Sequence, residues 1–389
     1  MDIIIVGSGM VGLALAKALE QQGFSIAIID TKRPELEWDE QQPVLRVSAI
    51  STASQRLLQS LGVWSAITAS KGCHAYQKMQ VWDQNSAAHI DFSASSIGAA
   101  QLGHIVDNRV IIKTLWQSLT SSARVKLLAS EKITHYIFDG LQWQLQLASG
   151  QSISARLLIG ADGAHSAVRQ QLGIGLTQTF SGHSALVCTV KTEKPHRDIA
   201  YQRFLTTGPL AFLPLCDPHH CSIVWSNNTE QANHLAALDP AVFNQYIAEA
   251  LEHRLGKVAL MGERVTFLLN RQHAEHYVKS QAVLIGDAAH SIHPLAGQGV
   301  NLGFADVAAL VDALSDVKRR ERPFYTPGVL NRYEYQRYGV NSSTLLAMEG
   351  FESLFSNQHA IKTMLRSMGM NAVDRWSCLK SWGVLQAMG

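Results

Sequence analysis

The sequence predicts an α/β fold with an inserted antiparallel β-sheet and a helical C-terminal region. An apolar, β-branched run at residues 3–6 leads through a glycine-rich turn into a helical pattern, and a second such run follows at 26–29. Residues 181–270 instead show short alternating strands, and apolar residues recur at helical spacing after Pro323. A strand, a helix and a second strand at the start of a chain are typical of a parallel, Rossmann-like unit.

Length and composition limit the class of protein. A chain of 389 residues is longer than one hydrophobic core usually holds, which predicts a large two-lobed unit. Charged residues make up 16% of the chain and the formal net charge is +2, so neither disorder nor nucleic-acid binding is expected. The 5 cysteines, an odd number without a regular framework, indicate a reducing compartment. No signal peptide and no apolar run of about 18 residues is visible, so we expect a cytoplasmic protein.

The first apolar run ends in a dinucleotide-binding pattern, GSGMVG at residues 7–12. Gly7 permits a tight turn, Gly9 lets backbone N–H groups approach a pyrophosphate, and Gly12 lets the following helix pack closely. The second run ends in Asp30, whose carboxylate can accept hydrogen bonds from a ribose. The residues predicted to bind the cofactor here are Gly7, Gly9, Met10, Val11, Gly12 and Asp30. This pattern alone suits NAD and FAD equally.

Two later segments carry further turns of the same kind. Residues 156–166 form a strand that ends in an Asp-Gly turn at Asp162 and Gly163, with a helix beginning near His165. Residues 282–303 form a buried strand, a loop rich in proline and glycine, and a helix that opens between Gln298 and Asn301. The start of this helix is a second potential binding site for an anion.

These motifs, GSGMVG, GADG, IGDAAH and HPLAGQGVNLG in that order, resemble the class A flavoprotein monooxygenases of the para-hydroxybenzoate hydroxylase type. The resemblance implies FAD as cofactor, with Asp287 bonded to its ribityl chain and residues 297–303 against its ring. It also implies that Asp162 and Gly163 contact FAD and NADPH, and that Arg46 lies near the cofactor. The further cofactor-binding residues that it implies are Gly286, Pro294, Gly297, Gln298, Gly299, Val300 and Asn301.

Within that family the sequence is more similar to the ubiquinone-biosynthesis hydroxylases. The matching segments are LRVSAIS at 45–51, LGVW at 61–64, VWD at 81–83, LGHIV at 102–106, FLPLCDPHHCSIVW at 212–225 and HPLAGQGVNLGF at 293–304. This resemblance implies hydroxylation of a polyprenylphenol with NAD(P)H and O2 through a flavin hydroperoxide, at ring position six by the nearest match. The same motifs leave open another ring position, an FAD-dependent isoprenoid reductase and a subunit that holds flavin only as a scaffold. Other proteins of ubiquinone biosynthesis, and a second copy of the chain, are the partners that it implies.

Two positions depart from the family pattern. Asp30 stands where the family usually has glutamate and is one methylene shorter, so we expect it to reach the ribose hydroxyls through a water and to discriminate FAD from NAD less well. Asn108 stands where many members have an arginine, and Arg109, one residue further on, points to another face of the predicted helix 109–119. The arginine contact of the family is therefore not carried over to this chain.

The predicted cofactor unit is discontinuous, formed by residues 1–75, 100–180 and 271–328. Residues 76–99 and 181–270 are predicted to form the substrate-binding sheet. The strands expected in it are 77–83, 88–92, 184–191, 199–206, 209–215 and 221–226, interrupted by a helix around 240–254. Residues 329–389 are predicted to form C-terminal helices at 329–356 and 359–370. They either pack on the cofactor unit or provide a Met- and Phe-rich surface for a prenyl tail, a partner or peripheral contact with the inner membrane.

No metal site or catalytic side chain is assigned from the sequence. The segment between Cys216 and Cys221 reads as a hairpin turn, since its thiols have no second Cys/His cluster with which to complete a zinc site. His290 and His293 are interpreted as structural or substrate-edge groups, with acceptance of a phenolic proton as the alternative. The expected chemistry belongs to the cofactor, which leaves the protein to orient the ring and exclude water.

Overall fold

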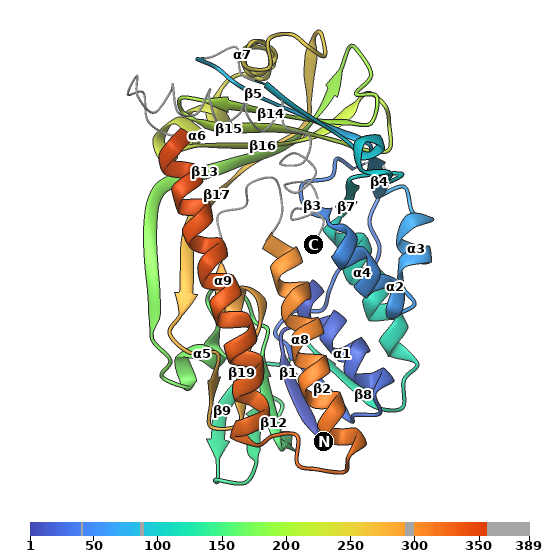
Figure 1. The fold of residues 1–389 in the computed structure, drawn as a ribbon, viewed down its shortest axis with the longest axis vertical. Helices are drawn as coiled ribbons and strands as arrows, with labels where there is room; N and C mark the ends of the chain where they lie inside the picture. Colours follow the sequence, from blue (N-terminus) through green and yellow to red (C-terminus); the bar gives the residue numbers. More distant parts are fainter. Residues whose placement is uncertain (40–41, 86–88, 292–298, 356–389) are drawn as a thin grey trace.

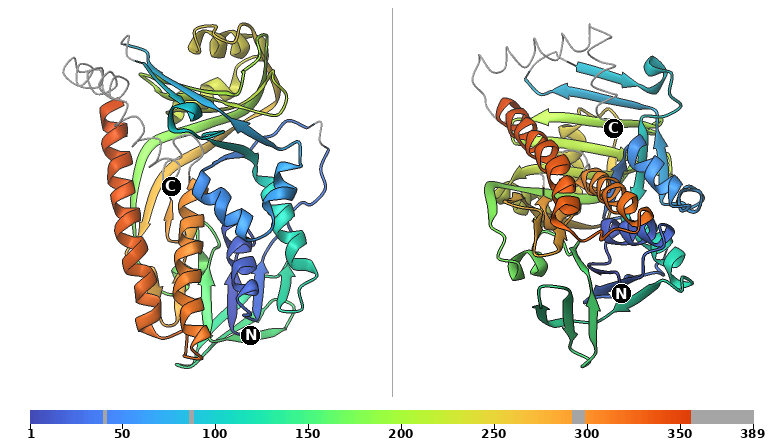
Figure 2. Two further views of the ribbon diagram at one scale, coloured as in Figure 1. Left: turned by 45° about the vertical axis from the view of Figure 1, so that its right-hand side comes forward. Right: turned by 60° about the horizontal axis from the view of Figure 1, so that its bottom comes forward.

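The computed structural model describes residues 1–39, 42–85, 89–291 and 299–355. A six-stranded sheet with helices beside it lies at one end of the molecule, and a larger sheet lies across the other end (Figure 1). The two long helices α8, Gly299–Arg319, and α9, Pro327–Phe355, run side by side along the molecule (Figures 1 and 2). The predicted helix 329–356 is thus confirmed as α9, whereas the expected helix 359–370 lies outside the described residues.

The six-stranded sheet has the order β18-β19-β12-β1-β2-β8. Its strands are β1 Ile3–Val6, β2 Ile26–Asp30, β8 Val125–Ala129, β12 Leu157–Gly160, β18 Val278–Lys279 and β19 Ala282–Leu284. All neighbours except β18 and β19 pair in parallel. Parallel strands end at the same edge of a sheet, so the predicted glycine turn and the turn after β12 lie at one edge.

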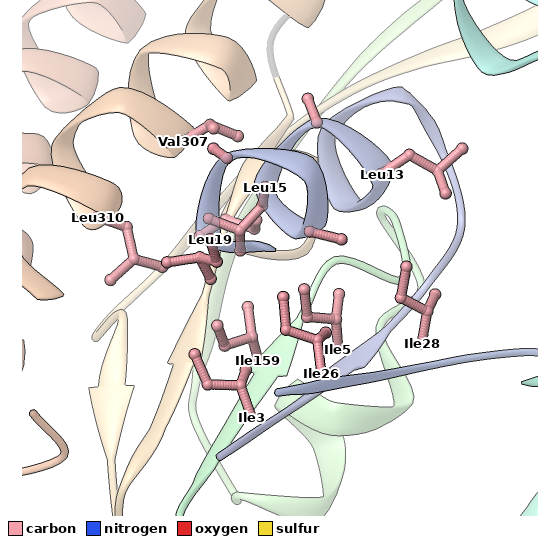
Figure 3. Packing of buried hydrophobic residues seen from close by; sticks show 14 of the residues in the cluster. Ile3, Ile5, Leu13, Leu15, Leu19, Ile26, Ile28, Ile159, Val307 and Leu310 are labelled. Atoms are coloured by element: carbon pink, nitrogen blue, oxygen red, sulfur yellow. The ribbon is translucent and has the colours of Figure 1, made fainter. Parts of the chain in front are cut away.

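Helix α1, Met10–Gln21, packs between this sheet and α8 (Figure 3). Leu15 and Leu19 of α1 are fully buried against Ile3 of β1 and against Val307 and Leu310 of α8. Burial of each of these leucine side chains stabilises the folded state by about 1.5–3 kcal/mol. This packing fixes the start of α1 at the edge where the parallel strands end.

The larger sheet has eight strands in the order β20-β17-β13-β16-β15-β14-β5-β6. Its strands are β5 Lys78–Asp83, β6 His89–Ser93, β13 Leu176–Thr192, β14 Ile199–Leu205, β15 Gly208–Pro214, β16 His220–Asn228, β17 Val258–Ala274 and β20 His290–Ser291. The six strands predicted from the sequence are all present. Strand β17 was not predicted, and β13 begins earlier than expected. The first half of β13 is largely exposed and most of β17 is half-buried, so neither shows a regular apolar alternation there.

Two helices cover the outer face of this sheet. The predicted helix 240–254 is present as α7, Pro240–Ala250, and it ends earlier because Glu252 and His253 adopt left-handed backbone angles, φ 57° and 53°. Helix α6, Thr229–Ala237, was not predicted. It begins where the Asn228 side chain accepts a hydrogen bond from the N–H of Gln231.

Two small sheets and several short helices complete the fold. One small sheet contains β3 Val47–Ile50, β4 Cys73–Tyr76 and β7 Gly103–Asp107, and another contains β9 Ile133–Phe138, β10 Trp143–Leu147 and β11 Ser152–Ala155. The other helices are α2 Thr52–Ser60, α3 Trp64–Thr68, α4 Asn108–Thr120 and α5 Ala167–Gln171, with short 3₁₀ turns at Ala94–Ile97 and Gly286–Ala288. Among the described residues, no helix combines the length and apolar character needed to cross a membrane.

Candidate cofactor site

The glycines of the first turn make contacts that no side chain would allow. Gly7 has φ +110°, and a Cβ there would lie 2.2 Å from the carbonyl oxygen of Ala161. A Cβ on Gly12 would lie 2.1 Å from the carbonyl oxygen of Gly7. Gly9, the N-cap of α1, has open space around it and no side chain that caps the helix. The first N–H groups of α1, from Met10 onward, therefore face an open region with partial positive charge.

A cavity of about 490 Å³ lies in front of this turn, at the edge where the parallel strands end. Its lining comprises Val6, Gly7, Gly9, Ile29, Asp30, Thr31, Glu131, Lys132, Ile133, Tyr136, Ala161, Asp162, Gly163, His165 and Ala167. Such a volume is typical of small-molecule sites. Bare glycines, free N–H groups and carboxylates are the groups that the adenosine and pyrophosphate part of FAD requires, so the residues present fit that cofactor.

Asp30 lines the cavity, but its carboxylate already has partners within the protein. Oδ2 accepts hydrogen bonds from the backbone N–H of Ser8 at 2.6 Å and from the Ser8 hydroxyl at 2.7 Å. Oδ1 accepts a hydrogen bond from the N–H of Lys32 at 3.0 Å. Asp30 thus ties the glycine turn to the end of β2.

Asp162 and Gly163 lie on the opposite wall of the cavity. Gly163 has φ +83°, which favours glycine. The Asp162 carboxylate accepts hydrogen bonds from the Ser166 hydroxyl at 2.5 Å and from the N–H of Ala167 at 2.7 Å, so it holds the start of α5. The predicted helix near His165 therefore begins two residues later, at Ala167.

Arg169 links this turn to the second glycine loop. Its guanidinium is buried and donates to the carbonyl oxygens of Ala288 and Ala164, each at 2.8 Å. Burial lowers the pKa of this guanidinium, while the charge of Asp162 opposes the shift. The turn after β12 and the turn after β19 are therefore held together by one side chain.

The second loop packs directly on the first turn of α1. A Cβ on Gly303 would lie 2.5 Å from Cγ2 of Val11, and a Cβ on Gly286 would lie 3.3 Å from Cγ1 of the same residue. Gly286 also has φ +57°. Because larger residues would separate these segments, the glycines place Asp287 beside the glycine turn.

The Asp287 side chain is accessible and makes no hydrogen bond within the described part of the chain. It nevertheless lies in a recess crowded by protein atoms, and this desolvation raises its pKa, while the charges of His290 and Arg46 act to lower it. An accessible carboxylate in such a recess is suited to accept hydrogen bonds from hydroxyl groups of a ligand.

Behind this loop lies a buried polar network that the sequence did not reveal. Asp306 of α8 is fully buried, and its carboxylate accepts hydrogen bonds from Gly286 N–H at 3.0 Å, His290 Nε2 at 2.6 Å and Arg337 Nε at 2.7 Å. Asn341 Nδ2 lies at 3.4 Å from the same carboxylate. Burial would raise the pKa of Asp306, but the charges and hydrogen bonds of His290 and Arg337 lower it.

This network decides the role of His290. Its side chain is 2% exposed and bonded to Asp306, so the structural interpretation holds and acceptance of a phenolic proton is not supported. His293, Pro294, Gly297 and Gln298 lie outside the described residues.

Other predicted residues hold neighbouring elements at the site. The Asn301 side chain accepts from the N–H of Ser51 at 3.1 Å and donates to the carbonyl oxygen of Ala49 at 2.8 Å, which joins α8 to β3. The guanidinium of Arg46 lies 4.3 Å from the ring centre of Phe267 in β17. Gly299 and Val300 form the first described turn of α8.

At Asn108, where the family pattern has an arginine, and at the adjacent Arg109, the side chains bind other residues of the protein. Asn108 accepts a hydrogen bond from the Ser48 hydroxyl at 2.7 Å, and Arg109 pairs with Asp107 at 2.7 Å.

Within the described ranges, the one group with metal-binding spacing is His74, His196 and Asp198. His196 accepts a hydrogen bond from the N–H of Asp198 and binds two carbonyl oxygens with its other nitrogen, so neither nitrogen is free for a metal. Cys216 is exposed and its thiol donates to the carbonyl oxygen of Cys73 at 3.1 Å, whereas Cys221 is fully buried.

Comparison with known proteins agrees with this geometry. The family model described as "FAD binding domain" matches residues 1–347. The chain is 39% identical over 389 residues to the 3-demethoxyubiquinol 3-hydroxylase of Escherichia coli, covering 100% of this chain and 98% of that protein. It is 34% identical over 392 residues to the ubiquinone hydroxylase UbiL of Rhodospirillum rubrum, covering 100% of this chain and 89% of that protein.

The chain belongs to the FAD-dependent ring hydroxylases of ubiquinone biosynthesis. Human ubiquinone biosynthesis monooxygenase COQ6, another member, is 34% identical and covers 97% of this chain and 90% of its own length. The protein is therefore an FAD-dependent monooxygenase, as its motifs predicted. The relative that is 39% identical is named for ring position three, whereas the motifs implied position six.

Solved structures confirm the fold class. A probable FAD-dependent monooxygenase of Pseudomonas aeruginosa, PqsL, superposes with a TM-score of 0.78 at 21% identity, covering 96% of this chain and 99% of that chain. The p-nitrophenol 4-monooxygenase PnpA of Pseudomonas putida superposes with a TM-score of 0.79 at 15% identity, covering 100% and 98%. The α/β fold with an inserted sheet and a helical C-terminal region is therefore that of the class A FAD monooxygenases.

Proposed function

We propose that this monooxygenase hydroxylates the aromatic ring of a polyprenylated phenolic intermediate of ubiquinone biosynthesis, with NAD(P)H and O2 as co-substrates. The observation that carries this proposal is the match to relatives named as ubiquinone hydroxylases, which extends over the whole chain. It therefore includes both glycine loops and the eight-stranded sheet. When bound, FAD would accept the electrons of NAD(P)H and activate oxygen.

The protein's own residues bind and orient the reactants. We assign the following residues to the cofactor site, either as contacts of FAD or as residues that hold its loops: Gly7, Gly9, Met10, Val11, Gly12, Asp30, Arg46, Asp162, Gly163, Gly286, Asp287, Pro294, Gly297, Gln298, Gly299, Val300 and Asn301. The accessible carboxylate of Asp287 would accept hydrogen bonds from the ribityl hydroxyls. The N–H groups at the start of α8 would stabilise negative charge on the reduced ring.

We assign the substrate side to the face of the eight-stranded sheet that looks toward the cofactor unit. Support comes from the apolar cluster of Ala185, Val187 and Leu269, against which Phe267 packs. Arg46 lies over Phe267 and so joins this face to the cofactor side. The corresponding division is a cofactor unit of residues 1–75, 100–180 and 271–328, a substrate unit of 76–99 and 181–270, and C-terminal helices at 329–389.

The experiment is a comparison of two substrates with the purified, FAD-loaded protein, NAD(P)H and O2. One is a short-chain 2-prenylphenol and the other is a short-chain 3-demethoxyubiquinol, and the product of each is identified by mass spectrometry and NMR. Oxygen insertion into the first at position six supports the motif-based assignment, and insertion into the second supports the position in the relative's name. Conversion of neither ring, with flavin that turns over, would overturn the proposed function.

A further inference from the structure

Three acidic residues line the cavity in front of the glycine turn: Asp30, Glu131 and Asp162, whose carboxylate holds the start of α5. A carboxylate has about four lone-pair positions for hydrogen bonds. At Asp30 three of them are filled by the N–H and hydroxyl of Ser8 and by the N–H of Lys32. Ser8 is 6% exposed, so the partner that engages Asp30 is buried, while Asp30 itself is half-buried at the cavity wall.

Glu131 follows β8, the strand next to β2 in the sheet. Its backbone N–H donates to the carbonyl oxygen of Asp30 at 2.9 Å, which fixes the two residues beside each other at the cavity wall. In contrast to Asp30, the Glu131 carboxylate makes no hydrogen bond or ion pair within the described ranges of the chain. Of the three acids in the cavity lining, Asp30 and Asp162 are therefore engaged by the protein, and Glu131 is left for the sugar of a bound nucleotide.

We propose that Glu131 accepts the hydrogen bonds of the adenosine ribose hydroxyls of FAD, whereas Asp30 acts as a positioning residue that holds the glycine turn through Ser8. The shorter side chain of Asp30 suits this division, because it stops at Ser8 rather than extending across the cavity. This proposal concerns the cofactor and does not depend on which ring is hydroxylated.

The test measures binding to the FAD-free protein of two probes, FAD itself and an FAD analogue with a 2′,3′-dideoxyribose in its adenosine half. Flavin fluorescence gives both dissociation constants, and their ratio reports recognition of the ribose hydroxyls. In the unmodified protein the analogue is expected to bind at least about tenfold more weakly, since a hydrogen bond to a charged group is lost.

Glu131→Ala is expected to bring this ratio close to one and to leave the affinity for the analogue unchanged, whereas Glu131→Gln, which keeps one acceptor oxygen, is expected to give a ratio between that of the alanine variant and that of the unmodified protein. Asp30→Asn and Ser8→Ala are expected to weaken both probes by the same factor, so the ratio stays as in the unmodified protein. Glu35→Gln, at an exposed glutamate outside the cavity lining, is the matched control and leaves both constants unchanged.

A general loss of structure would weaken both probes alike and would not change the ratio. The proposal is overturned if the unmodified protein does not discriminate between the probes, if the Asp30 variant removes the discrimination, or if Glu131→Ala keeps it in full. Because no turnover is measured, failure of this proposal is distinguishable from failure of the proposed function.

Discussion

Replacing Asp306 by alanine is expected to destabilise the protein strongly and to weaken FAD binding. The carboxylate of Asp306 is fully buried and holds both the N–H of Gly286 and the side chain of His290. It is also the acidic partner of Arg337, whose side chain is 8% exposed. The alanine variant would leave this guanidinium buried without its counter-charge.

Removal of one partner of a buried ion pair costs about 3–5 kcal/mol. The lost hydrogen bonds to Gly286 and His290 act in the same direction, so we expect a loss of about 4 kcal/mol or more in the free energy of unfolding. Asp306→Asn keeps the shape of the side chain and should lower the free energy of unfolding by less, about 2–3 kcal/mol, because one oxygen remains as an acceptor. FAD should bind more weakly to both variants, since the Gly286 turn is no longer fixed.

The assay is urea unfolding of the FAD-free protein, followed by FAD titration of the variants that remain folded. Asp316→Ala is the control on the same helix, because Asp316 is partly exposed and pairs only with arginines at the surface. It should change the free energy of unfolding by less than about 1 kcal/mol. A loss below about 1 kcal/mol for Asp306→Ala would refute the assigned role of this network.

The same network predicts a dependence on pH. The pKa of Asp306 is lowered in the folded protein, so its stabilising contribution is complete above the pKa of the unfolded chain, about 4. This contribution is lost as the pH falls through the lower, folded value. The difference in stability between the unmodified protein and Asp306→Asn should therefore shrink below about pH 4.

Three further predictions concern other parts of the fold. Gly7→Ala should lower the free energy of unfolding by about 2 kcal/mol or more and abolish FAD binding, because its Cβ would clash with the carbonyl oxygen of Ala161. Thermal unfolding and flavin fluorescence measure these two effects. Arg169→Met should raise the dissociation constant of FAD about tenfold or more by releasing the two turns it joins, whereas an unchanged constant would contradict that role. Burial, with a smaller effect of His74, lowers the pKa of His104 to about 4. As the pH falls below about 6.5, His104 is therefore protonated in the unfolded chain before it is protonated in the folded protein. The free energy of unfolding of the unmodified protein should decrease by about 2 kcal/mol between pH 7 and pH 5, and His104→Phe should not show this decrease.

Local patterns were sufficient to predict the cofactor loops. Gly7 and Gly12 lie at fixed distances from a buried strand, and their close contacts follow from the turn itself. The strands of the eight-stranded sheet with regular alternation were predicted for the same reason. The exposed first half of β13 and the half-buried strand β17 lack that alternation, and their pairing over long distances in the sequence was not visible.

The polar network could not be predicted, because it depends on the relative placement of two helices. Asp306 interrupts an apolar stripe that includes Phe304, Val307 and Leu310, and this interruption is a signal for a buried acid. Its partner Arg337 lies 31 residues further on in α9, and no local pattern joins the two. The engagement of Asp30 by Ser8 was similarly hidden, since the sequence indicates an acid at the strand end but not which group it binds.

The central claim is that this FAD-dependent monooxygenase inserts oxygen into the ring of a ubiquinone-pathway phenol. The most direct measurement uses heavy-isotope O2 with the FAD-loaded protein, NAD(P)H and a short-chain prenylated phenol, and determines the mass of the product. We predict that the ring of the product carries one labelled oxygen atom and that the amount of product matches the amount of NAD(P)H consumed. A product that carries no labelled oxygen, or a prenyl double bond reduced without O2, would contradict the claim.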